Sequence, residues 1–225
     1  RVRAPFAPLT VPGVVTAVLG LSLLATFAYQ DWRRVRGNTD LYRSFYGTLQ
    51  VKRYPVPRKR GGVIHLLDGR ISHGFQYAGD TYRREPTAYF VPKSGVGSLL
   101  SGFQTNTRIG VLGLGVGTLA SYARPGDHYQ FYEINPDVED VAREHFSYLR
   151  DVRGRVDVHI GDGRLELAKQ TPQGFDLLVV DAFTGDAIPA HLLTKEAMEL
   201  YLSHLKPKGV LAINISNRHA DLARV

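Results

Sequence analysis

The chain has 225 residues, of which 44% are hydrophobic and 22% are charged, a balance typical of a folded protein rather than a disordered one. It contains no cysteine, which excludes disulfide bonds, thiolate metal sites and a cysteine nucleophile. The net charge of +7 is uneven: residues 1–60 hold eleven Lys and Arg against two acids, and the remainder holds seventeen against nineteen. A nucleic-acid-binding surface on the main part of the chain is therefore disfavoured.

Residues 11–29 carry no charge and consist mostly of Val, Leu, Ala and Gly, which is long enough to cross a membrane as a helix. Trp32 and three arginines follow at once, as at the cytoplasmic end of a span. The alternatives are a buried core helix and a signal peptide, although no small-residue cleavage pattern follows the apolar run. We predict a transmembrane helix with a basic juxtamembrane segment over residues 1–40.

A small antiparallel β unit is expected over residues 41–80. Residues 42–54 alternate and are rich in Tyr, Phe and Val, which predicts one strand. Residues 63–69 and 70–77 predict a hairpin around a turn at Gly69. Residues 81–101 are mixed, with a helix expected near their end.

From residue 108 onward, apolar strands alternate with helical patterns, which predicts an α/β domain with a Rossmann-like parallel sheet over residues 81–225. The predicted strands are 109–112, 129–134, 156–160, 177–180 and 210–215. The predicted helices are about 117–124, 136–149, 163–170 and 194–205. Asn135 and Pro136 are a typical helix start, and Pro207 with Gly209 is expected to close the last helix.

A glycine-rich loop, residues 113–118, follows the first parallel strand and reads Gly-Leu-Gly-Val-Gly-Thr. Glycines allow close approach of a nucleoside-bearing ligand, and Glu133 ends the next strand, where a carboxylate can accept the ribose hydroxyls. A dinucleotide fingerprint requires Gly or Ala where this chain has Thr118. The pattern therefore favours a nucleoside sulfonium such as S-adenosylmethionine and disfavours hydride transfer with a dinucleotide.

Acids also follow the next two parallel strands. Asp162 lies in a tight turn between two glycines and is expected to accept a hydrogen bond from an adenine amino group, although it could instead cap the following helix. Asp181 ends an apolar strand at the same carboxyl edge, where ligands of parallel sheets bind. The long loop that follows could cover the pocket. His191 in that loop, like His145 and His204, is interpreted as a surface or packing residue.

These motifs together resemble the spermidine synthase (polyamine aminopropyltransferase) family over about residues 41–222. The resemblance rests on Gly113–Gly117, Tyr132–Pro136, Gly161–Gly163, Val180–Phe183 and the run Leu67-Asp68-Gly69. It is strongest toward bacterial spermidine-synthase-like domains fused to a transporter-like membrane region. Those domains carry an Asp-Ala-Phe-x-x-Asp-x-Ile-Pro-x-His-Leu-Leu-Thr run, which residues 181–194 match.

The resemblance implies an S-adenosylmethionine-dependent methyltransferase-type fold and transfer of an aminopropyl group from decarboxylated S-adenosylmethionine to a polyamine such as putrescine, without a metal. It implies Asp181 as the catalytic acid. It implies donor-binding by Gly113, Gly115, Gly117, Glu133, Asp162 and Gly163, and polyamine-binding by Gln76, Tyr89 and Asp186. It also implies a homodimer, and a place at the bacterial inner (plasma) membrane with the catalytic domain in the cytoplasm.

The acceptor amine sets the chemical problem. An alkyl amine with a pKa near ~10.4 is mostly protonated at neutral pH, and three pH units correspond to about 4 kcal/mol. A carboxylate such as that of Asp181 can accept the proton and orient the freed amine.

Two other functions stay open. The family's glycine loop has an acid where this chain has Val116, which keeps open a methyltransferase that uses intact S-adenosylmethionine. The N-terminal span keeps open a non-enzymatic polyamine or nucleoside sensor attached to a membrane transporter. The chain begins with Arg1 and stops after the fifth predicted strand, so we expect it to be a piece of a longer fused protein.

Overall fold

The computed structural model describes residues 11–36, 39–56, 61–183 and 188–214. The chain divides into two compact units, residues 1–39 and 40–225. The first unit holds helix α1 (Val11–Arg36), whose stretch Val11–Gln30 is long and apolar enough to cross a membrane, and its most apolar part has no buried residue. A signal sequence would meet the same criteria of length and composition.

The second unit begins with a four-stranded sheet in the order β1-β2-β3-β4. Its strands are β1 (Thr39–Ser44), β2 (Gly47–Tyr54), β3 (Val63–Asp68) and β4 (Ile71–Tyr77). The hairpin predicted within residues 63–77 is confirmed, because β3 and β4 pair antiparallel. The single strand predicted over residues 42–54 is wrong, because a turn at Phe45 and Tyr46 divides it and Gly47 leaves that turn with a φ of +137°, a value that favours glycine.

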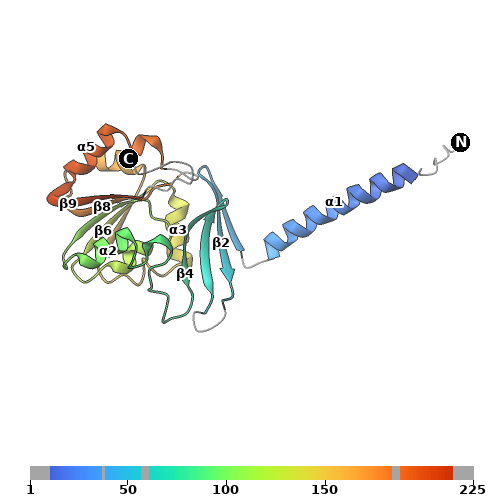
Figure 1. Ribbon diagram of the computed structural model, residues 1–225, viewed down its shortest axis with the longest axis horizontal. Helices are drawn as coiled ribbons and strands as arrows, with labels where there is room; N and C mark the ends of the chain where they lie inside the picture. Colours follow the sequence, from blue (N-terminus) through green and yellow to red (C-terminus); the bar gives the residue numbers. More distant parts are fainter. Residues whose placement is uncertain (1–10, 37–38, 57–60, 184–187, 215–225) are drawn as a thin grey trace. The chain divides into compact units, whose positions relative to one another are not determined.

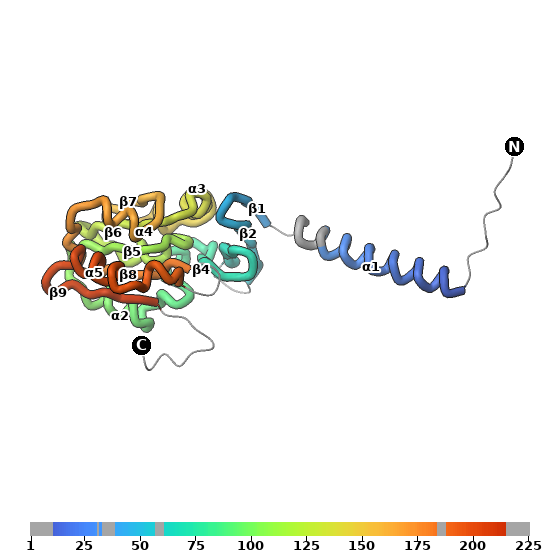
Figure 2. Tube along the Cα trace, turned by 90° about the horizontal axis from the view of Figure 1, so that it is seen from above, coloured from blue at the N-terminus to red at the C-terminus, as the bar shows by residue number. Residues whose placement is uncertain are grey.

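The larger sheet has five strands in the order β7-β6-β5-β8-β9, which lie side by side in Figure 2. They are β5 (Arg108–Leu112), β6 (His128–Glu133), β7 (Arg155–Ile160), β8 (Phe175–Val180) and β9 (Leu205–Ile213). The neighbouring strands pair in parallel, which confirms the predicted parallel α/β sheet. The chain runs outward from β5 to β7 and then crosses back to β8, so the strand order reverses between β5 and β8. Such a reversal leaves a crevice at the carboxyl ends of the strands, where ligands bind.

Helices cover both faces of this sheet, with α5 on one side and α2 on the other (Figure 1). The α-helices are α2 (Gly95–Gly102), α3 (Pro136–His145), α4 (Gly163–Ala168) and α5 (Lys195–Ser203). Three short 3-10 helices are η1 (Ala88–Phe90), η2 (Thr118–Tyr122) and η3 (Ala190–Leu192). The N-caps of α3 and α5 are Asn135 and Thr194, whose side-chain oxygens accept backbone N–H groups of the first turn.

Several predicted boundaries are wrong for identifiable local reasons. The α-helix predicted over 117–124 is the shorter η2, because Gly117 is left-handed and Ala123 is extended. The helix predicted over 136–149 ends at His145, where the buried Phe146 turns extended. Pro207 and Gly209 do not close a helix but lie inside β9, which is the outermost strand of the sheet within the described residues, a position that tolerates proline.

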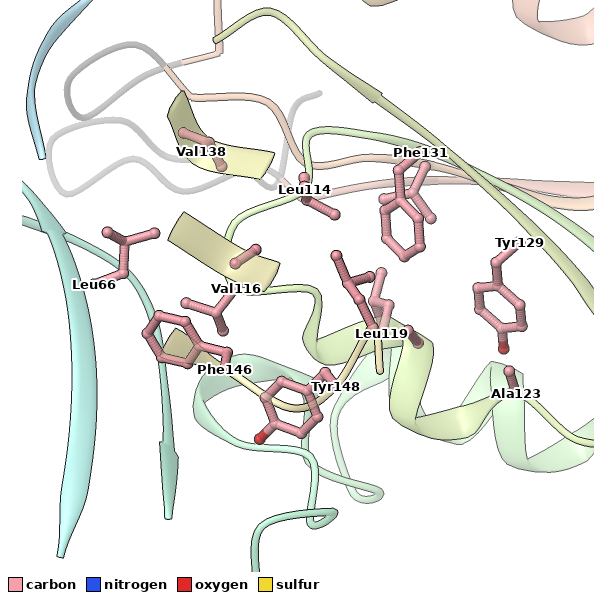
Figure 3. Packing of buried hydrophobic residues seen from close by; sticks show 14 of the residues in the cluster. Leu66, Leu114, Val116, Leu119, Ala123, Tyr129, Phe131, Val138, Phe146 and Tyr148 are labelled. Atoms are coloured by element: carbon pink, nitrogen blue, oxygen red, sulfur yellow. The ribbon is translucent and has the colours of Figure 1, made fainter. Parts of the chain in front are cut away.

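The core follows the two-residue alternation of the buried strands. Val111 and Val179 join a cluster beneath α2, η2, α3 and the small sheet, whereas Leu112 and Val180 face α4 and α5. Figure 3 shows the first cluster, in which Val116 lies close to neighbouring apolar side chains from separate elements. Burial of each such aliphatic side chain contributes about 1.5–3 kcal/mol, so the core fixes the sheet rigidly beneath its carboxyl edge.

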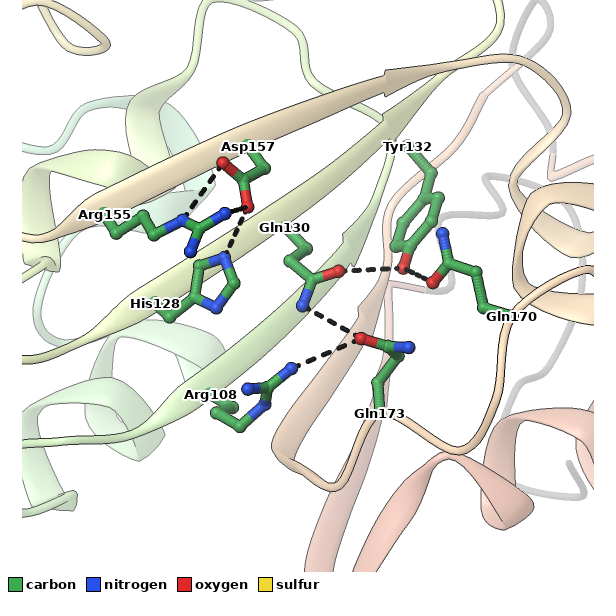
Figure 4. Close-up of polar contacts among 8 residues, drawn as sticks. All are labelled: Arg108, His128, Gln130, Tyr132, Arg155, Asp157, Gln170 and Gln173. Carbon is green, nitrogen blue, oxygen red and sulfur yellow. Dashed lines mark hydrogen bonds and ion pairs between the residues drawn. The ribbon is translucent and has the colours of Figure 1, made fainter.

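A polar network holds the segment after α4 against the sheet (Figure 4). The Tyr132 hydroxyl donates to Gln170 Oε1 at 2.8 Å, and Gln130 Nε2 donates to Gln173 Oε1 at 3.2 Å. Because the C-terminal end of α4 is tied to β6 in this way, the position of Asp162 at its N-terminal end is fixed as well.

Candidate active site

A cavity of about 550 Å³ lies at the carboxyl ends of the parallel strands. That volume is within the range of small-molecule binding sites, about 300–1,000 Å³. Each strand of the large sheet contributes a lining residue at or just after its end, namely Gly113, Glu133, Asp162, Asp181 and Asn214 in the order of the strands along the chain. The three acids that the sequence places at this edge therefore face one shared cavity, together with Gly115, Gly163 and Tyr89.

The glycine loop touches the rest of the site backbone to backbone. Gly113 has a φ of +96°, and a Cβ there would lie 2.5 Å from the carbonyl oxygen of Asp181. Gly115 has a φ of +54°, and a Cβ would lie 2.6 Å from the carbonyl oxygen of His73. Gly117 does not line the cavity: its left-handed backbone turns the chain into η2, and the space beside it is filled by Leu149. The prediction that Gly117 contacts the donor is therefore not supported.

Glu133 braces this loop from the neighbouring strand. Its Oε2 accepts the backbone N–H of Leu114 at 3.0 Å, and its Oε1 accepts the N–H of Asn135 at 3.0 Å. Burial raises the pKa of Glu133, while these two hydrogen bonds oppose the rise. The carboxylate lines the cavity, so Glu133 stabilises the loop and also presents acceptor lone pairs to a ligand.

Asp162 serves two purposes at once. Its Oδ1 accepts the N–H of Leu165 at 3.0 Å, so Asp162 caps the helix that follows it, α4, as the sequence allowed. Its Oδ2 lies 2.8 Å from Nε2 of His191, and both residues line the cavity. His191 is exposed, which confirms its interpretation as a surface residue, but it also lines the cavity beside Asp162.

Asp181 is held by two hydrogen-bond donors from distant parts of the chain. The Tyr89 hydroxyl donates to Oδ2 at 3.1 Å, and Asn214 Nδ2 donates to Oδ1 at 2.6 Å. Burial raises the pKa of Asp181 to about 7, although both hydrogen bonds act to lower it. A carboxyl group with this pKa can gain and lose a proton near neutral pH. Asn214 belongs to no motif and was missed by the sequence reasoning.

The segment that carries Tyr89 to this carboxylate has an unusual backbone. Ala88 has a φ of +54°, a left-handed value that is uncommon for a residue with a Cβ. The Tyr122 hydroxyl anchors the same segment by donating to the carbonyl oxygen of Phe90. Burial and the nearby Asp181 carboxylate both raise the pKa of Tyr89, so its hydroxyl remains protonated and can donate.

Gln76 was predicted to bind the polyamine, but it does not line the cavity. Its side chain is buried and lies outside the cavity lining. The amide accepts the N–H of Ser147 at 2.9 Å and donates to the carbonyl oxygen of Arg83 at 2.6 Å. Gln76 therefore ties β4 to the segment after α3 and is not available to a ligand in the cavity. Of the other two predicted residues, Tyr89 lines the cavity and Asp186 lies outside the described residues.

Val116 stands in the glycine loop at the position where the resembling family has an acid, and its side chain does not line the cavity. Val116 is only 1% exposed and points into the core, where a Cβ on Gly74 would lie 2.7 Å from its Cγ2. Ile71, Ser72 and His73 of β4 line the cavity instead. Burial lowers the pKa of His73, and the negative charge of the Asp68 carboxylate partly opposes this shift. Among the described lining residues the acids are Glu133, Asp162 and Asp181, and there is no Lys or Arg.

No group of three His, Asp or Glu side chains that could hold a metal ion occurs among the residues placed in the structure.

Two curated relatives are similar in sequence to part of the chain. The chain is 34% identical over 112 residues to a polyamine aminopropyltransferase of Vibrio vulnificus, which covers 48% of this chain and 37% of that protein. It is 30% identical over 109 residues to a probable polyamine aminopropyl transferase of Bifidobacterium longum, covering 47% of this chain and 23% of that protein.

A solved structure has a similar fold. A probable spermidine synthase from Corynebacterium glutamicum superposes with a TM-score of 0.60 at 21% identity, covering 78% of this chain and 63% of that one. At this identity the likeness concerns the fold. The curated matches span well under half of the relatives' own lengths. No protein-family model matches the chain.

Proposed function

We propose that the chain is the catalytic part of a polyamine aminopropyltransferase that moves an aminopropyl group from decarboxylated S-adenosylmethionine to a diamine such as putrescine. One observation carries the proposal: the Asp181 carboxyl group, with a pKa of about 7, shares one cavity with Glu133 and Asp162. The two relatives named for this activity support the same reaction class.

The residues fit an adenosyl sulfonium donor. Glu133 offers carboxylate oxygens to the ribose hydroxyls, and Asp162 offers an acceptor to the adenine amino group. Gly113 and Gly115 present bare backbone to the ligand. Three acids without a described Lys or Arg give the cavity an electronegative lining, which favours both a sulfonium and a diammonium substrate.

The reaction needs a free amine beside an activated carbon. Asp181 accepts a proton from the acceptor ammonium, and the freed nitrogen attacks the aminopropyl methylene carbon that is bonded to sulfur. A new C–N bond forms, the C–S bond breaks, and its electron pair goes to sulfur to give neutral methylthioadenosine. Tyr89 and Asn214 hold the two oxygens of Asp181, so the carboxylate is already oriented toward the incoming ammonium.

A product assay tests this proposal. The full chain, in detergent, is incubated with decarboxylated S-adenosylmethionine and a panel of diamines, and methylthioadenosine is measured by chromatography. We expect methylthioadenosine and an equimolar aminopropylated amine. Absence of both products with every diamine would reject the proposal.

The buried Val116 favours one second candidate, a methyltransferase that uses intact S-adenosylmethionine. Val116 supplies no carboxylate at the position where the resembling family has one, so the α-carboxylate of the intact donor meets no opposing charge from that residue. The same assay run with S-adenosylmethionine separates the two reactions. Methyl transfer releases S-adenosylhomocysteine, whereas aminopropyl transfer does not.

The pH dependence of kcat/KM is expected to follow Asp181. The base must be ionised, so kcat/KM should rise about tenfold per pH unit below a midpoint near 7 and level off above it. Tyr89→Phe removes a hydrogen bond that lowers the pKa, so its midpoint should move upward. Steady-state rates between about pH 5.5 and 9 measure both values. A wild-type kcat/KM that stays flat down to about pH 5.5, as expected for an ordinary Asp with a pKa of about 3.9, would contradict this role.

We further propose that α1 anchors the enzyme in a bacterial inner membrane with the catalytic unit in the cytoplasm. Its uninterrupted apolar stretch Val11–Gln30 and the arginines that follow support this arrangement. Release of the protein into the soluble fraction by alkaline carbonate would argue against it. We also propose that the chain forms a homodimer and is fused to a transporter-like region. Light scattering of the detergent-solubilised chain tests the dimer.

A further inference from the structure

We propose that His191 is a positioning residue that sets the purine specificity of the donor site, by orienting the Asp162 carboxylate toward a 6-amino group. The inference rests on the proposed function, because it takes the nucleoside to bind beside Asp162. Nε2 of His191 lies 2.8 Å from Oδ2 of Asp162, and both side chains line the cavity. An ionised carboxylate carries no proton, so this contact requires a proton on Nε2 of the imidazole.

The surrounding structure holds His191 in place. Arg164 Nη1 donates to the carbonyl oxygen of His191 at 2.8 Å, and the Tyr201 hydroxyl donates to the carbonyl oxygen of Leu192 at 3.2 Å. Leu192 itself is buried in the same cluster as Tyr201. The η3 segment is therefore tied to both α4 and α5, and the imidazole approaches Asp162 from a braced backbone.

Asp162 is consequently fixed at both oxygens. Leu165 holds Oδ1 through the helix cap, and His191 holds Oδ2. Each carboxylate oxygen can accept two hydrogen bonds, so a lone pair stays free on each for a ligand in the cavity. A 6-aminopurine donates to such an acceptor, whereas a 6-oxopurine presents another acceptor and is repelled. Without His191 only the cap bond remains, and the carboxylate loses part of its orientation.

The test compares the dissociation constants of 5′-methylthioadenosine and 5′-methylthioinosine, measured by calorimetry on the full chain in detergent. We expect the wild type to prefer the adenosine compound by about 10- to 100-fold, the range of a hydrogen bond to a charged group. His191→Ala should reduce that preference by about tenfold. His191→Gln, which retains an N–H donor, should restore most of it. A purely structural role would weaken both nucleosides equally and leave their ratio unchanged.

The chain offers a matched control in His128, which contacts Asp157 at 2.7 Å on the large sheet (Figure 4) and does not line the cavity. His128→Ala should leave the ratio of the two dissociation constants unchanged. In an Asp162→Asn background, His191→Ala should have no further effect on the ratio. The inference about His191 is overturned if His191→Ala leaves the ratio of the two dissociation constants unchanged. It is also overturned if His191→Ala changes that ratio equally in the wild type and in Asp162→Asn. Neither result affects the proposed function. Failure of the wild type to bind either nucleoside overturns the proposed function and this inference with it.

Discussion

Asp181→Asn is expected to lower kcat by about 10²- to 10⁴-fold, the usual contribution of a positioned general base. The amide cannot accept the proton of the acceptor ammonium, so the nucleophile stays protonated. The hydrogen bonds from Tyr89 and Asn214 hold the present carboxylate, and Asn keeps its shape, so we expect the fold to survive. Single-turnover release of methylthioadenosine measures the chemical step, and calorimetry with methylthioadenosine measures donor-site binding.

The matched control is Asp176→Asn on the same strand, β8. Asp176 pairs with Lys206 at 2.7 Å, accepts the backbone N–H of Arg108 at 2.8 Å and does not line the cavity. Asn keeps an acceptor for that N–H and loses only the partly exposed ion pair, so kcat should stay within about twofold of wild type. Binding of methylthioadenosine by Asp181→Asn should also stay within about threefold of wild type, because Asp181 acts on the amine rather than on the nucleoside. Retention of wild-type kcat in Asp181→Asn would remove Asp181 from the mechanism. Nucleoside binding by a wild type without turnover would favour the sensor.

Gly113→Ala is expected to destabilise the protein by more than ~3 kcal/mol and to abolish turnover. The left-handed backbone at φ +96° alone disfavours alanine by about 1–2 kcal/mol. The new Cβ would also lie 2.5 Å from the carbonyl oxygen of Asp181, a backbone atom that cannot rotate away. Either the glycine loop or the catalytic strand end must shift. Urea unfolding followed by near-ultraviolet circular dichroism gives the free energy of unfolding.

Gly174→Ala separates the two contributions. Gly174 also has a left-handed backbone, with φ +64°, but the nearest atom to a new Cβ is Lys206 Cγ at 3.9 Å. Its substitution should therefore cost only the backbone term of about 1–2 kcal/mol and leave activity near the wild-type level. Equal losses of stability in the two variants would show that the close approach of Gly113 to Asp181 is unimportant.

The sequence predicts the parts of this protein that depend on local patterning. Near-continuous apolar runs bounded by turn residues locate the central strands β5, β6 and β8, because these strands are buried on both faces. The positions of Glu133, Asp162 and Asp181 at strand ends then follow, since parallel strands share one carboxyl edge. The boundaries near Phe45, Phe146 and Pro207 do not follow, because burial and strand pairing override the local signals there.

The finer composition of the site depends on contacts between residues far apart in the chain. Gln76 is a polar residue in a recognisable hairpin, yet its side-chain amide forms hydrogen bonds with the backbone of Ser147 and Arg83 instead of facing the cavity. Asn214 follows a strand without any motif, yet its amide reaches Asp181. No spacing rule distinguishes a polar side chain that satisfies buried backbone from one that faces a ligand, because the choice depends on which groups the fold brings nearby.

Local patterning in the chain is enough to predict the parallel α/β architecture, the apolar N-terminal helix and the three acids at the strand ends, because each depends on residues adjacent in the chain or repeated at a fixed period. The tertiary structure alone decided that Val116 points into the core, that His191 reaches Asp162, and that Tyr89 and Asn214 hold the two oxygens of Asp181. The physical reason is that hydrogen bonding and burial act through space. Tyr89 and Asp181, for example, are 92 positions apart in the chain and meet only after the sheet has formed.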